Sequence, residues 1–142
     1  MQTTKFREYI ILNQVLNSIF NRISKTGSKI AGAIKRSKQR NELRDMLSVG
    51  GRRNVFEAVK KEPILLERLV EVISNRLESP KVRIYAAEVI MRLSAEGVDI
   101  SRVRRTIENL ELKRLIPLAA IKYINATLAK EIIELPPFSD EF

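Results

Sequence analysis

The sequence contains no cysteine, no histidine and no tryptophan, and it has only five glycines and five prolines in 142 residues. Without cysteine, disulfides and thiolate metal sites are excluded. Without histidine, the most common general base and a frequent metal ligand are absent. The low glycine and proline content, together with 44% hydrophobic and 30% charged residues, is typical of a folded helical chain. We therefore expect an all-α fold with little or no strand.

Catalytic and phosphate-binding motifs are also absent from the sequence. No two acidic residues form an obvious catalytic pair, and most glutamates lie beside Lys or Arg at the spacing of a solvated helix surface. Gly27 and Gly32 have the spacing that opens a phosphate-binding loop, but Ala33 and Ile34 follow where Lys and Ser or Thr are needed. We expect no enzyme, no cofactor, no metal site and no small-molecule substrate.

Long apolar runs are missing as well. No stretch of eighteen uncharged apolar residues exists, and the opening "MQTTKFREYI" lacks the apolar core of an export signal. We therefore expect neither export nor direct membrane insertion. The lack of cysteine and the abundance of Arg, Lys, Glu and Ile are typical of cytosolic proteins from hot environments, so a thermophilic source is expected.

What the chain has in excess is positive charge, and the excess lies at one end. The net charge is +9, and residues 1–53 hold twelve Lys and Arg against three Asp and Glu. Residues 54–142 hold fourteen of each and are neutral. Such asymmetry is typical of a chain that binds a polyanion with one end and protein with the other.

Helical periodicity predicts a long basic N-terminal arm over residues 1–53. Apolar residues recur at spacings of three and four from Thr4 to Ile23, and the stripe continues to Ile30 and Ile34 before it stops. Gly27 and Gly32 within the arm indicate a kink, a break or a surface that another molecule approaches closely. The "SVGGRR" stretch at 48–53 predicts the end of the arm.

The remainder predicts a compact bundle of short helices over 54–134, followed by an extended tail over 135–142. Ser79 and Pro80 form a cap and first-turn pair, Gly97 ends that helix, and Ser101 can cap the next. The expected helices cover residues 54–61, 63–77, 80–96, 102–110 and about 114 or 117 to 134.

The tail "LPPFSDEF" cannot continue a helix because of its paired prolines. It carries Phe138 and Phe142, which have little of their own segment to pack against. We expect this tail to dock in an apolar groove of an adjacent subunit and so to act as an assembly element.

Two stretches of the bundle are similar to each other. "SPKVRIYAAEVIMRL" and "RLIPLAAIKYINATL" align when Ala86-Ala87 is superposed on Ala119-Ala120. The first resembles the second helix of a HEAT-type repeat, which implies a helical adaptor that binds other proteins. The alternative is that both helices use alanine at a close contact.

The basic segment carries the candidate binding residues. Ten cations lie within 32 residues: Arg22, Lys25, Lys29, Lys35, Arg36, Lys38, Arg40, Arg44, Arg52 and Arg53. On a helix over 22–47, about 39 Å long, the first eight would lie on several faces and could neutralise a phosphate backbone regardless of base sequence. Aromatic residues are absent from 21–53, which favours duplex DNA over stacked single strands. The alternative is a solvated basic arm.

This layout resembles that of the major capsid proteins of filamentous and rod-shaped archaeal viruses. The similarity covers the whole chain: short, cysteine-free, helical and basic, with an N-terminal arm ahead of a compact body. It implies an N-terminal segment that wraps double-stranded DNA, and self-assembly, alone or with a paralogous subunit, into a helical nucleoprotein. It also implies location in a virion, or in the cytoplasm or nucleoid if the protein is cellular. A membrane-surface protein is a further alternative, since "ISKTGSKIAGAIKR" is also typical of a basic amphipathic helix.

Overall fold

The computed structural model describes residues 29–130 and 135–138, and every regular element within them is a helix. The all-α prediction is therefore confirmed for the described residues. The chain divides into two units, Met1–Ser37 and Lys38–Phe142, which are described separately here. In the first unit residues 29–37 are helical, and the expected helix over residues 4–23 lies outside the described residues.

Helical structure runs without interruption from residue 29 to residue 48, so the chain does not break at Gly32. Within the second unit, Leu43 and Leu47 lie one turn apart and are almost completely buried. The compact unit thus begins at Lys38, ahead of the boundary expected after Arg53. The difference arises because these two leucines belong to the hydrophobic core.

The "SVGG" stretch ends this helix by a specific backbone arrangement. Gly50 has a φ of 85°, its N–H donates to Leu47 O at 3.1 Å, and the N–H of Gly51 donates to Met46 O at 2.7 Å. This pair of bonds is the Schellman motif, which favours glycine at the left-handed position. The predicted break is confirmed here, and the next helix begins directly at Arg52.

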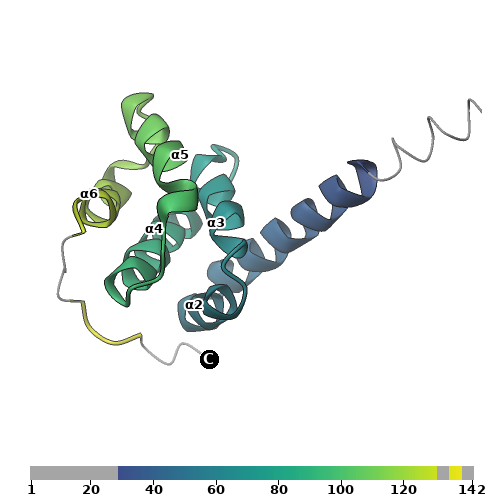
Figure 1. Ribbon diagram of the computed structural model, residues 1–142, viewed down its shortest axis with the longest axis horizontal. Helices are drawn as coiled ribbons and strands as arrows, with labels where there is room; N and C mark the ends of the chain where they lie inside the picture. The colour runs from purple at the N-terminus through teal and green to yellow at the C-terminus, as the bar shows by residue number, and fades with distance from the viewer. Residues whose placement is uncertain (1–28, 131–134, 139–142) are drawn as a thin grey trace, which may run out of the picture. The chain divides into compact units, whose positions relative to one another are not determined.

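After Gly51 the second unit continues with five α-helices, labelled in Figure 1, and one short 3-10 helix. They are α2 (Arg52–Lys61), α3 (Leu65–Ser74), α4 (Pro80–Ala95), α5 (Ser101–Leu112) and α6 (Ile121–Ala129), with the short 3-10 helix η1 (Leu118–Ala120) leading directly into α6.

Several predicted boundaries are confirmed and others move. Ser79 caps α4 by accepting a hydrogen bond from Val82 N at 3.3 Å, and Gly97, with a φ of 91°, ends it in a second Schellman motif. Ser101 is not the cap of α5 but its first residue. The carboxylate of Asp99 accepts from Ser101 N at 2.9 Å and supplies the capping oxygen instead.

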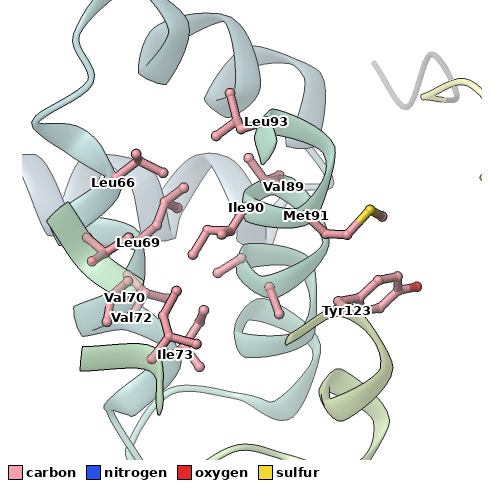
Figure 2. Close-up of a cluster of buried hydrophobic side chains, with 14 of the residues drawn as sticks. Leu66, Leu69, Val70, Val72, Ile73, Val89, Ile90, Met91, Leu93 and Tyr123 are labelled. Carbon is pink, nitrogen blue, oxygen red and sulfur yellow. The ribbon is translucent and has the colours of Figure 1, made fainter. Parts of the chain in front are cut away.

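The hydrophobic core lies mainly between α3 and α4. Figure 2 shows side chains of the two helices converging, among them Leu69 and Ile73 from α3 and Ile90 from α4, all fully buried. α3 has apolar residues on adjacent turns, and α4 is apolar over most of its circumference because it also contacts α2 and α6. The central position of α4 explains why so few of its residues are exposed.

The two similar stretches form the second helices of two successive hairpins. α3 pairs with α4 and α5 pairs with α6, while α3 contacts α5 and α4 contacts α6. Ala86, Ala87 and Ala120 are completely buried, whereas Ala119 is exposed. The alignment therefore identifies equivalent packing at one alanine of each pair, and small side chains allow the helices to approach there.

Candidate nucleic-acid interface

The first unit contributes three of the predicted cations to the described structure. Lys29, Lys35 and Arg36 lie on its helical residues, and all three are exposed. Within the described part of the chain, none of them forms an ion pair with an acidic side chain. Arg22, Lys25 and Gly27 lie outside the described residues, so their predicted roles stay predictions.

Gly32 lies on the same helical segment, and its backbone is open. A Cβ added there would meet only the end of the flexible Arg36 side chain, at 3.3 Å from Nη1. No packing within the first unit therefore requires glycine at this position. The predicted close approach of another molecule to Gly32 stays a prediction.

In the second unit, three of the candidate cations differ in how they are engaged. Lys38 is exposed, and no described acid pairs with it. Arg40 lies 3.6 Å from Glu71 on α3, and Arg44 pairs with Asp45 at 2.9 Å. The Asp45 hydrogen bond is the main cause that raises the pKa of Arg44. Glu78, 3.6 Å from the Arg44 guanidinium, adds to the effect.

Arg52 is held inside the bundle. Its Nη1 donates to both carboxylate oxygens of Glu88, at 3.0 and 2.9 Å, and its guanidinium lies 4.5 Å from the centre of the Tyr85 ring. These contacts neutralise its charge and bury most of the side chain. Arg52 was selected from the sequence by charge alone, but the structure places it in a buried ion pair. Arg53, the next residue, is exposed.

The tail differs from the sequence expectation. Phe138 packs on its own chain instead of being left without a partner: its ring meets Phe56 edge-on at 5.5 Å, and the Arg92 guanidinium lies 4.1 Å above it. Arg92 also donates to Pro136 O at 2.7 Å. The tail residues 135–138 thus lie over α2 and α4 of the same chain, while Phe142 lies outside the described residues.

A cluster around Glu88 was missed by the sequence analysis. Glu88 is 7% exposed in its side chain, contacts Arg52 as described above, and lies 3.5 Å from Arg92 Nε. The one available sequence signal was the four-residue spacing of Glu88 and Arg92, which is common on solvated helices and therefore uninformative. Among the described residues no group of His, Cys, Asp or Glu is arranged to hold a metal ion.

No helix among the described residues has the length and apolar character needed to cross a membrane. Comparisons with protein-family models, with curated proteins and with solved structures find no match to this chain.

Proposed function

We propose that this chain is a structural protein that binds double-stranded DNA without sequence preference and self-assembles with it into a helical nucleoprotein. The observation that carries the proposal is the contrast between two sets of cations. Lys29, Lys35, Arg36 and Lys38 are exposed and unpaired among the described residues, whereas Arg52 is neutralised inside the bundle by Glu88.

The physical argument is counterion release. Each cationic side chain that contacts a phosphate displaces a condensed counterion, so a series of unpaired cations on a helix gains affinity for any duplex. The backbone of duplex DNA presents phosphates evenly along its length, which suits charges spread along a segment. The absence of aromatic residues from 21–53 argues against base stacking as the main contact.

The assembled form follows from the resemblance to archaeal virus capsid proteins and from the charge layout. One end of the chain has the excess charge, and the neutral remainder has the apolar surface for protein contacts. We propose that copies of the chain, alone or with a paralogous subunit, coat DNA in a virion. Location in a cellular nucleoid is the alternative.

The proposal is tested by the salt dependence of duplex binding. Contacts with about 6 to 10 phosphates give a log–log slope of about −5 to −9, since each contributes about −0.9. A variant with Lys29, Lys35, Arg36 and Lys38 changed to Gln should flatten the slope by about 3 to 4 and weaken binding equally for unrelated duplexes. Fluorescence anisotropy over a salt series measures both.

The matched control removes four exposed cations from elsewhere, namely Arg76, Arg105, Lys113 and Arg114. This variant has the same net charge as the first, so only the location of the lost charges differs. We expect it to keep most of the slope. A wild-type slope shallower than about −3, or equal losses in both variants, would contradict the proposal.

A second candidate function is a protein-binding adaptor. It is favoured by the packing of α3 on α5 and of α4 on α6, the arrangement by which helical repeats stack. Purification from the native source distinguishes the two candidate functions. Nuclease-protected DNA carried with the protein supports the coat, and a protein partner without nucleic acid supports the adaptor.

A further inference from the structure

A groove on the second unit lies where helical residues 39–46 face α2 and the start of α3. It encloses about 520 Å³. Its apolar lining comes from Met46, Ala58 and Leu65, together with the buried Leu43. Met46 and Ala58 are only partly buried, so the groove presents apolar surface that no described side chain covers.

The polar lining of this groove is mainly acidic. Glu42, Glu57 and Glu62 line it and are exposed, against a single cation, Lys61. None of the three glutamates forms an ion pair or a side-chain hydrogen bond with another described residue. Most other glutamates of the second unit pair with arginine or lysine, so this group of unpaired carboxylates is exceptional on a unit that is otherwise balanced in charge.

The first unit carries a segment of complementary character. Ile30 and Ile34 are 52% and 62% exposed, and their four-residue spacing places them on one side of the helix. At about 100° per residue, Lys29 and Lys35 lie on the two flanks of this pair, about 120° from its centre, and Arg36 lies nearly opposite to it. Residues 23–36 contain no acid at all. Two large apolar side chains next to cations are what an acidic apolar groove would bind.

We propose that the groove binds the helical segment around Ile30 and Ile34 of a second copy of this chain. The isoleucines would cover Met46 and Ala58, and the flanking Lys29 and Lys35 would approach Glu57 and Glu62. This is the helix-in-groove mode, in which an apolar stripe gives affinity and rim charges set orientation. The inference rests on the proposed self-assembly and names the contact that produces it.

The geometry of such a contact explains an open assembly. The donor segment and the acceptor groove are different surfaces, so each copy offers one of each to its neighbours. Contacts of this head-to-tail kind do not saturate in a pair and extend into rings or helical filaments. Arg36, which lies nearly opposite the isoleucines on this helical segment, would stay available for DNA.

Disulfide trapping tests the proposal directly, because the chain has no cysteine of its own. A size-tagged Ile34→Cys chain is mixed with an untagged Ala58→Cys chain without DNA at low salt, and then oxidised. We expect a disulfide between the tagged and untagged chains. The control pairs Ile34→Cys with Thr106→Cys, an exposed site on α5 away from the groove, and should give little product.

Charge reversal at the groove is the second arm of the test. Adding Glu62→Lys to the Ala58→Cys chain should reduce the trapped product about fivefold or more, because an attraction becomes a repulsion. Glu111→Lys, the same charge change on exposed α5, should leave the yield unchanged. Equal yields from the groove pair and the control pair would overturn the inference. So would a disulfide that forms within one chain carrying both Ile34→Cys and Ala58→Cys but not between separate chains.

Failure of the inference is distinguishable from failure of the proposed function. Duplex binding with the steep salt slope but no trapped product leaves the DNA-binding proposal standing and removes this contact. Trapped product without any duplex binding does the reverse. Anisotropy with a short duplex is measured on the same wild-type preparation.

Discussion

At the scale of single residues, Glu88 carries the most consequence for stability. It is the acid that faces Arg52 and Arg92, and all three side chains are at least 85% buried. A buried pair need not stabilise a fold relative to apolar residues, but removal of one partner leaves charge without compensation. We expect Glu88→Ala to lower the free energy of unfolding by about 3 kcal/mol or more.

Urea unfolding followed by circular dichroism measures this loss, and Glu108→Ala serves as its control. Glu108 pairs with Arg104 at 3.1 Å on the exposed side of α5, where such a pair contributes about 0.5 kcal/mol. Similar midpoints for the two variants would show that the Glu88 cluster is not the buried electrostatic centre that its contacts indicate.

Asp99 makes the stability of the fold depend on pH in the acidic range. Its carboxylate accepts hydrogen bonds from the backbone N–H and the hydroxyl of Ser101, and these lower its pKa below the ordinary value. A carboxylate with a lowered folded-state pKa stabilises the fold above its unfolded pKa, about 3.9, and this contribution is lost as pH falls through the folded-state pKa.

We therefore expect Asp99→Asn to destabilise the protein near neutral pH, with the difference from wild type shrinking as pH falls through the lowered folded-state pKa of Asp99. Thermal unfolding across a pH series measures the difference. A constant difference at every pH would mean that the substitution acts through geometry and not through the charge of Asp99.

At the scale of elements, Arg83 joins the two helical hairpins. Its Nε donates to Ile73 O at 2.7 Å at the end of α3, and its Nη2 donates to Leu115 O after α5. Burial is the main cause that lowers the pKa of this guanidinium, and Arg76 adds to it. One planar side chain thus supplies donors to carbonyls of two separate elements.

Arg83→Lys should cost about 1.5–3 kcal/mol, because an ammonium at one point cannot serve both carbonyls and the charged hydrogen bond to one of them is lost. Chemical unfolding measures the change. Arg105→Lys, an exposed substitution on α5, should change stability by less than about 0.5 kcal/mol. A lysine variant as stable as wild type would show that Arg83 does not join the hairpins.

The element boundaries were predictable where local backbone chemistry sets them. Gly50 and Gly97 end helices in the left-handed conformation, as expected of glycine. Arg114 adopts the same conformation after α5, with a φ of 54° and the same pair of hydrogen bonds, yet arginine carries no signal for it. The end of α5 was therefore the less predictable one.

At the scale of the whole molecule, the net charge of +9 bounds how much DNA one copy neutralises. A duplex has two phosphates per base pair, so charge matching gives about four to five base pairs per copy. The helix predicted over 22–47 would span about 39 Å, or about 11 base pairs. We expect a footprint of about 4 to 12 base pairs, measured by nuclease protection and the protein-to-DNA mass ratio.

A footprint below about two base pairs would leave most of the positive charge unused and would favour the adaptor. Duplex binding is also measured for a chain truncated after Leu135 and compared with that of the full chain. Because Phe138 packs on its own α2 and α4, this truncation is expected to leave duplex binding intact.

The sequence by itself determined the helical class, the position of the excess charge and several helix ends, because composition, periodicity and caps act over a few neighbouring residues. Only the tertiary structure decided which cations form ion pairs inside the protein. In the sequence Arg52 and Lys38 both count only as positive charges. In the structure Arg52 pairs with Glu88, 36 residues away, while Lys38 pairs with no described acid. Ion pairs between distant residues depend on how helices pack, and no local spacing encodes that packing.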